Sequence, residues 1–181
     1  KVEAEKLIIK NYDKSKENYI LRFATAFGYS DRMRFDLTVN EFTRELYLQN
    51  KLTIFDKNTW RPYCHTSDFA NVIFKLIDSN SLKTSLKILN VGSNLNNYTK
   101  NDIVGLLSNK FNNVELEFLE KGIDTRNYMV SFDNLNKILP NLKFKSIDEG
   151  VDEIIFYLKR NYFNDFSKNI NFYGNYKIDY N

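Results

Sequence analysis

The stretch Tyr19–Gly28, YILRFATAFG, decides how the chain folds. It is a mostly apolar run that is rich in strand-forming residues, and a glycine closes it. Such runs are typical of strands buried on both faces of a parallel sheet, because helices cover both sides of these sheets. The sequence therefore predicts a parallel sheet whose other strands come from elsewhere in the chain.

The segments around this strand alternate between helical and extended patterns. We predict helices over residues 1–10, 35–50, 67–79, 99–111, 133–139 and 147–162, and further strands over residues 52–55, 87–92 and 114–119. Thr99 is suited to be the N-cap of its helix, and Asp102 stands in the first turn, where the helix dipole favours an acid. Alternating helices and strands predict an α/β fold.

Composition narrows the classes of function. The chain has 181 residues, of which 43% are hydrophobic, enough for one domain with a core. No apolar run is long enough to span a membrane and the first ten residues lack the features of a secretory signal, so we expect a cytoplasmic protein. The net charge of +3 is spread along the chain, which argues against nucleic-acid binding.

The stretch Trp60–Asp68, WRPYCHTSD, gathers the only Trp, Cys and His of the chain. One thiol and one imidazole are too few for a disulfide or a structural zinc site, so we expect no metal. His65 and Asp68 stand at a strand-to-helix junction, where shaping the turn is the favoured role. Arg61 is the candidate for chemistry, because a guanidinium can bond two oxygens of a diphosphate at once; an exposed salt bridge is the alternative.

Three segments together resemble the second half of the extended short-chain dehydrogenases/reductases, in the branch of NAD-dependent sugar-nucleotide epimerases and dehydratases. Their order and spacing cover roughly residues 1–160. The segments are LRFATAFG with SDRMRFDLTVNEF (residues 21–28 and 30–42), TIFDKNTWRPYCHTSDFANVI (residues 53–73) and LNVGSNLNNYTKNDI (residues 89–103).

This resemblance implies the last strands of a Rossmann-type parallel sheet together with the smaller α/β substrate-binding domain, over residues 1–160, followed by a C-terminal tail over residues 161–181. It also implies that the half of the family fold that binds most of the cofactor lies upstream. The glycines of this chain are too dispersed for a G-x-G-x-x-G pyrophosphate turn. The expected cofactor is NAD, with NADP not excluded.

The resemblance also assigns roles to particular residues. Lys1 matches the lysine of a Tyr-x-x-x-Lys pair, which favours the catalytic tyrosinate and binds the nicotinamide ribose. Phe23, Ala24 and Thr25 match the strand end beside the nicotinamide, although many relatives have Asn in place of Thr25. For the substrate, a nucleoside-diphosphate sugar, the matching residues are Asn40, Arg61, Arg126 and Arg34.

The expected function is therefore that of the nucleotide-sugar-binding portion of an epimerase or dehydratase that acts through hydride transfer and a keto-sugar intermediate. The intact parent is expected to form a homodimer, and this portion alone is expected to be inactive. One alternative is a non-catalytic relative that binds a nucleotide or a partner protein. Another is an unrelated basic interaction domain, for which replacing Arg61 weakens nucleic-acid binding instead.

Overall fold

The computed structural model describes residues 1–79, 85–120, 126–167 and 170–175, and the fold is α/β, as the sequence predicts. Helical elements are α1 (Val2–Asn11), α2 (Thr38–Gln49), α3 (Thr66–Asp78), η1 (Asn94–Asn96), α4 (Lys100–Ser108), α5 (Asp133–Ile138), α6 (Ile147–Lys159) and η2 (Ile170–Tyr173). The strands are β1 (Asn18–Phe23), β2 (Thr25–Phe27), β3 (Lys51–Phe55), β4 (Trp60–His65), β5 (Leu86–Val91), β6 (Asn97–Thr99) and β7 (Glu115–Leu119).

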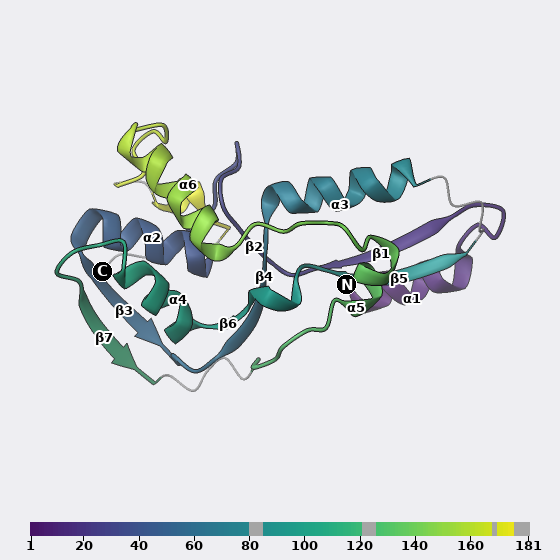
Figure 1. Cartoon of the computed structure of the whole chain (residues 1–181), viewed down its shortest axis with the longest axis horizontal. Helices are drawn as coiled ribbons and strands as arrows, with labels where there is room; N and C mark the ends of the chain where they lie inside the picture. The colour runs from purple at the N-terminus through teal and green to yellow at the C-terminus, as the bar shows by residue number, and fades with distance from the viewer. Residues whose placement is uncertain (80–84, 121–125, 168–169, 176–181) are drawn as a thin grey trace.

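The predicted single strand over Tyr19–Gly28 is in fact two strands, which is a correction to the sequence prediction. β1 runs parallel to β5, with Phe23 opposite Val91, and β2 runs parallel to β4, with Thr25 opposite Tyr63. Ala24 separates the two strands, and its N–H still bonds to Val91 (3.0 Å). One apolar run therefore connects two sheets, of which the β1–β5 pair lies at one end of the elongated molecule and the β2–β4–β6 sheet near its middle (Figure 1).

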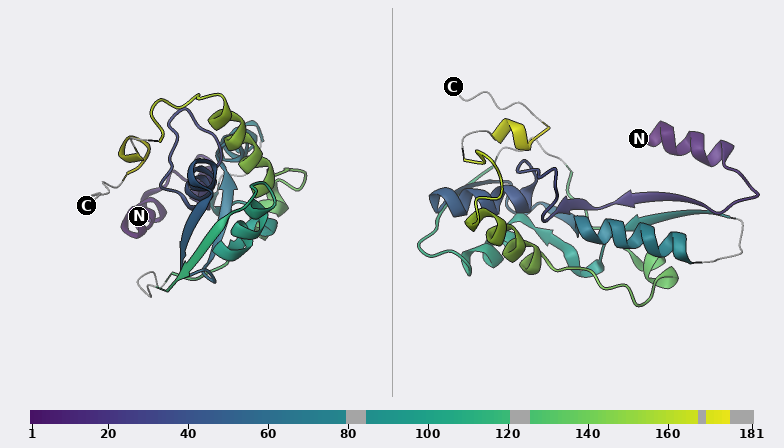
Figure 2. Two further views of the ribbon diagram at one scale, coloured as in Figure 1. Left: turned by 90° about the vertical axis from the view of Figure 1, so that its left-hand side faces the viewer. Right: turned by 90° about the horizontal axis from the view of Figure 1, so that it is seen from above.

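Helices α3 and α5 cover one face of the β1–β5 pair. Their buried apolar residues form a cluster with the strands: Val72, Leu76, Leu89, Val91 and Leu135. Helix α1 buries no residue and stands to one side of the strand pair (Figure 2). Its link to the strand is the pair between Glu5 and Arg22, in which Arg22 Nε donates to Glu5 Oε2 at 3.0 Å.

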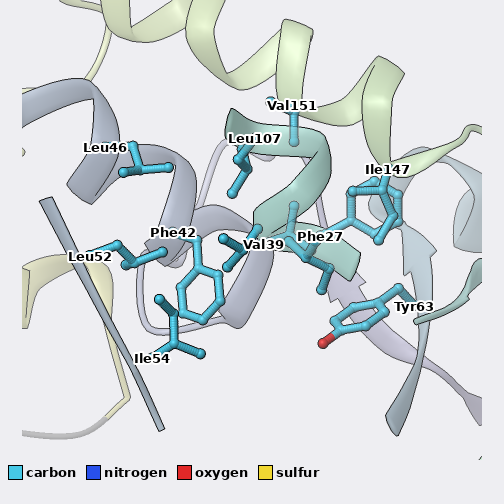
Figure 3. Packing of buried hydrophobic residues seen from close by; sticks show 12 residues of the cluster. Phe27, Val39, Phe42, Leu46, Leu52, Ile54, Tyr63, Leu107, Ile147 and Val151 are labelled. Carbon is cyan, nitrogen blue, oxygen red and sulfur yellow. The ribbon is translucent and has the colours of Figure 1, made fainter. Parts of the chain in front are cut away.

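The largest core cluster lies where α2, α4 and α6 pack together over β2, β3 and β4. Figure 3 shows Phe42 beside Ile54, and Leu107 and Val151 belong to the same cluster, so four different elements contribute to it. Thr99 is confirmed as the N-cap of α4, and the structure adds a full capping box, because Thr99 Oγ1 accepts from the Asp102 N–H and Asp102 Oδ2 accepts from the Thr99 N–H. β4 pairs antiparallel with β6, which places this cap beside the strand.

The described part of the predicted C-terminal tail packs on the domain. Phe163, Phe166 and Tyr173 are buried with Phe35 and Ile154 in one aromatic cluster. Arg44 Nε donates to the carbonyl of Phe166 at 2.8 Å, which fixes the segment to α2. In the ranges that the structure describes, no helix combines the length and the apolar character needed to cross a membrane.

Candidate functional site

A cavity of about 280 Å³ opens where β1 gives way to β2. The residues that line it include Phe23, Ala24, Thr25, Pro62, Tyr128 and Phe132. The segment predicted to contact the nicotinamide therefore forms one wall, at a strand end where open α/β sheets bind ligands. Phe23 is 42% exposed, and its ring centroid lies 4.5 Å from that of Phe69.

The fold brings Arg61 and Arg126, which are distant in sequence, into direct contact. Arg61 Nη1 donates to the Trp60 carbonyl at 2.7 Å and to the Arg126 carbonyl. The Arg61 guanidinium also lies over the Tyr128 ring, 5.2 Å from its centroid. Trp60 N–H donates to Asn127 Oδ1 at 2.9 Å, which secures the same segment. Tyr128 thus links Arg61 to the cavity beside Phe23–Thr25.

Tyr63 lies two residues after Arg61 on β4 and has a fully buried side chain. Burial raises the pKa of its phenol to about 12, and the nearby Thr38 side chain and the Arg61 charge oppose that shift only in part. Within the described residues its hydroxyl lacks a hydrogen bond of good geometry. A buried hydroxyl without a well-formed hydrogen bond is costly, which sets Tyr63 apart from its apolar neighbours in the core.

Thr38 begins α2, and the preceding Leu37 offers no side-chain cap to the first-turn N–H groups. The N-terminus of a helix carries partial positive charge and favours anions. Arg61 and the start of α2 therefore both lie near Tyr63, and each of them favours an anionic group.

Asn40 lies in the first turn of α2 and is 2% exposed. Its Oδ1 accepts from the Gly28 N–H at 3.0 Å, and its Nδ2 donates to the Arg34 carbonyl at 2.9 Å. In this structure the amide connects the end of β2 to the loop before α2. The predicted contact with substrate stays a prediction, and the geometry gives Asn40 a role in holding that loop.

Arg34 pairs with Asp36 through both carboxylate oxygens. Nε donates to Oδ1 at 2.9 Å and Nη2 donates to Oδ2 at 2.7 Å. Although burial opposes it, this pairing and the Asn175 N–H hold the pKa of Asp36 below its usual value. The Asp36 carboxylate is thus ionised and fixes the direction of the Arg34 side chain.

His65 is the N-cap of α3 and is 1% exposed, which confirms its predicted role in shaping the turn. Its Nδ1 accepts from the Ser67 N–H at 3.1 Å, so the proton lies on Nε2, which donates to Glu153 Oε2 at 2.6 Å. Asp68 accepts from the Lys145 N–H at 2.9 Å. Over the ranges described, no three His, Cys, Asp or Glu side chains are grouped to hold a metal ion.

Glu153 joins α6 to the turn after β2. Its Oε2 also accepts from the Tyr29 N–H at 3.1 Å, and its Oε1 pairs with Lys145 at 3.1 Å. Burial would raise the pKa of Glu153, but these donors and His65 bring it below the usual value. Burial lowers the pKa of His65, so the imidazole is neutral at physiological pH.

Lys1 is exposed and precedes α1, where its carbonyl accepts from the Glu5 N–H at 3.0 Å. The link from this helix to the cavity runs through the Glu5–Arg22 pair, since Arg22 is one of the lining residues. The predicted catalytic role of Lys1 stays a prediction.

Sequence reasoning missed Tyr63 and Thr38 as members of this site. The alternation of a strand was the available signal, because Arg61 and Tyr63 are two residues apart and so belong to the same face of β4. Tyr63 was not singled out because an aromatic residue in an apolar run is more often part of the core.

No known family model matches the sequence. Several solved structures share its fold. The NAD-dependent NDP-hexosamine 5,6-dehydratase of tunicamycin biosynthesis is 18% identical with a TM-score of 0.65, over 78% of this chain and 46% of that one. The ADP-L-glycero-D-manno-heptose-6-epimerase of Helicobacter pylori is 11% identical with a TM-score of 0.69, over 85% of this chain and 48% of that one.

The UDP-glucuronic acid 4-epimerase of Bacillus cereus, solved with UDP-glucuronic acid and NAD, is 19% identical with a TM-score of 0.64. The match covers 78% of this chain and 45% of that one. The chain therefore has the fold of part of the extended short-chain dehydrogenases/reductases that act on nucleotide sugars, and it spans about half the length of these structures.

Proposed function

We propose that the chain is the C-terminal, nucleotide-sugar-binding portion of an NAD-dependent sugar-nucleotide epimerase or dehydratase. One observation carries the proposal: Arg61 and Thr38 at the uncapped start of α2 both act on the buried Tyr63 phenol, and Pro62, which stands between Arg61 and Tyr63, lines the cavity beside Phe23–Thr25. The shared fold with NAD-dependent nucleotide-sugar enzymes supports it.

The diphosphate of the substrate is the group that suits the Arg61 region. The guanidinium neutralises charge and donates to phosphate oxygens, and the first-turn N–H groups of α2 add neutral donors. Tyr128, which lies against Arg61, extends the contact surface toward the cavity. Arg126 is proposed as a second cation at the same diphosphate. Binding energy from this remote group would orient the sugar for reaction.

The wall formed by Phe23, Ala24 and Thr25 is proposed to contact the nicotinamide end of NAD, with NADP as the other candidate. Bound beside this wall, the cofactor would supply the hydride-transfer chemistry of the reaction. The cavity size of about 280 Å³ suits one ring and its neighbours rather than a whole dinucleotide, so the remaining contacts are proposed to come from the upstream half. Lys1 is proposed to favour the tyrosinate form of the catalytic tyrosine through its charge.

The exposed apolar residues of α1 are consistent with such an upstream half. Val2 and Leu7 are 68% and 64% exposed, and β1 pairs with β5 alone among the described strands. Two-stranded sheets are marginal by themselves. From the resemblance we also propose that the parent enzyme is a cytoplasmic homodimer and that this portion alone does not turn over substrate.

Calorimetric titration with UDP, dTDP and ADP tests the binding proposal. Replacing Arg61 with Ala is expected to weaken the binding of the nucleoside diphosphate roughly tenfold or more, because charged hydrogen bonds are lost. Arg160→Ala is the matched control, because its guanidinium stacks on Phe156 at the end of α6 (3.5 Å to the centroid). The proposal would be refuted if the wild-type chain bound none of these nucleotides, or if Arg61→Ala weakened the binding of RNA instead.

Turnover measurements on the proposed parent protein distinguish an enzyme from a non-catalytic binding module. An enzyme requires a Gly-rich turn upstream and a Tyr four positions before Lys1. Lys1→Met in that protein is then expected to lower turnover of nucleotide sugars while leaving UDP affinity unchanged. Binding without turnover by the wild-type protein would instead identify a module that keeps only the fold.

A further inference from the structure

The C-terminal segment over residues 170–175, here called the strap, contacts the loop that carries Arg34. The Phe35 N–H donates to the Tyr173 carbonyl at 2.7 Å, and the Asn175 N–H donates to Asp36 Oδ2 at 3.0 Å. These two bonds hold the two residues that directly follow Arg34. The strap is thus bonded to the loop at consecutive positions, from a point more than 130 residues later in the sequence.

The oxygen that the strap holds is the same one that holds Arg34. Asp36 Oδ2 accepts from Arg34 Nη2 at 2.7 Å as well as from Asn175. Charged hydrogen bonds of this kind are short and directional, so fixing the carboxylate also fixes the guanidinium. With the strap displaced, Asp36 would lose one of the donors that keep its pKa low, and Arg34 would sample more conformations.

Aromatic packing holds the strap itself in place. The Tyr173 ring meets the Phe35 ring edge-on at a centroid distance of 5.4 Å and the Phe163 ring at 6.1 Å. Its hydroxyl donates to the Asn164 carbonyl at 2.5 Å. The ring is buried, whereas the adjacent Phe172 is 76% exposed. Tyr173 therefore anchors the strap and Phe172 does not.

We infer that the strap, anchored by Tyr173 and acting through Asp36, is a positioning element that orients Arg34 toward the phosphates of a nucleoside diphosphate. This inference rests on the proposed function, because it takes Arg34 as a substrate-binding residue. The same loop leads into the first turn of α2 and is tied to it by the bond between Asn40 and the Arg34 carbonyl. The strap thus supports the anion-binding region from outside it.

Titration with UDP by calorimetry tests the inference with variants of the whole chain. Tyr173→Ala is expected to weaken UDP binding roughly tenfold. The same loss is expected for Arg34→Ala, because in both variants the guanidinium no longer occupies its place. Tyr173→Phe keeps the ring and is expected to stay within about twofold of wild type, and Phe172→Ala in the same segment is the matched control. Asp36→Asn keeps the strap but removes the charge that holds Arg34, and is expected to match Tyr173→Ala.

The double variant decides whether the strap acts through Arg34. If it does, adding Arg34→Ala to Tyr173→Ala causes no further loss of UDP affinity, since coupled residues are not additive. Losses that multiply, or wild-type affinity in Tyr173→Ala and Asp36→Asn while Arg34→Ala binds weakly, would overturn the inference and leave the proposed function standing. Should Tyr173→Ala fail to fold, Asn175→Pro removes the strap's N–H donor to Asp36 and is expected to weaken UDP binding in the same way; wild-type affinity in that variant would overturn the inference. A wild-type chain that does not bind UDP overturns both.

Discussion

Gly28 supports the site by allowing a close approach of backbone to His65, and replacing it with Ala tests this directly. Its φ is +89°, in the left-handed region that L side chains rarely adopt. A Cβ at this position would lie 2.9 Å from His65 Cε1 and closer still to two other ring atoms. The ring has little freedom to move, because Ser67 and Glu153 bond both of its nitrogens.

The expected cost follows from these two effects. A left-handed backbone costs an L residue about 1–2 kcal/mol, and overpacking a core costs about 1–3 kcal/mol. We therefore expect Gly28→Ala to lower the free energy of unfolding by about 2–5 kcal/mol, a large part of the stability of an ordinary domain. The Gly28 N–H also donates to Asn40, so the loop before α2 is expected to loosen with it.

Urea unfolding followed by circular dichroism measures the difference, and Gly105→Ala is its matched control. Gly105 lies inside α4, and an added Cβ there meets nothing within 4 Å. Because Ala is the better helix former, this control is expected to raise stability by about 1 kcal/mol. A Gly28→Ala variant within about 1 kcal/mol of wild type would refute the reasoning, since both the strain and the overlap would then have been absorbed.

Three further outcomes are expected. Burial lowers the pKa of His65 from 6.5, so below about pH 6.5 the unfolded chain binds more protons at this residue than the folded chain does. The urea midpoint should therefore fall as the pH drops from 6.5. His65→Gln should reduce this dependence of the midpoint on pH. Thr99→Ala removes one half of the capping box and should cost about 1 kcal/mol in urea unfolding, whereas an unchanged midpoint would contradict the cap. Cys64 is fully buried and burial raises the pKa of its thiol, so a thiol reagent should label it only in denaturant; rapid labelling of the folded chain would contradict its placement.

Local signals in the sequence account for most of the helices and strands. The N-cap at Thr99 and the helix after His65 depend on residues within a few positions, and the structure confirms both. The division of Tyr19–Gly28 into two strands is different. Both halves are equally suited to a strand, and the break at Ala24 is set by which distant strand each half meets, β5 or β4. A one-dimensional pattern holds no information on that choice.

The candidate site likewise has parts that the sequence could predict and parts that only the fold determines. The motif around Arg61 and the segment around Arg126 were each visible in the sequence, and the fold brings them together through the bond from Arg61 to the Arg126 carbonyl. The complete burial of Tyr63, and the absence of a well-formed hydrogen bond to its hydroxyl within the described residues, are properties of the fold alone. The strap was unpredictable because its Asn- and Tyr-rich sequence has no periodicity, and its order comes from single aromatic contacts with the loop at Phe35.

The polar residues that hold this site together are buried and come from distant segments. Substitutions of these residues should therefore differ in their effect on stability from substitutions of residues that contact the diphosphate. Asn40 joins the end of β2 to the loop before α2, and His65 joins β4 to Glu153 of α6. Losing either partner leaves a buried group unsatisfied, so stability and nucleotide affinity should fall together. Arg61 is partly exposed at its site, and its loss should lower affinity while leaving the urea midpoint nearly unchanged. Measuring both quantities for each variant therefore distinguishes residues that contact the diphosphate from residues that hold the contacting ones in place.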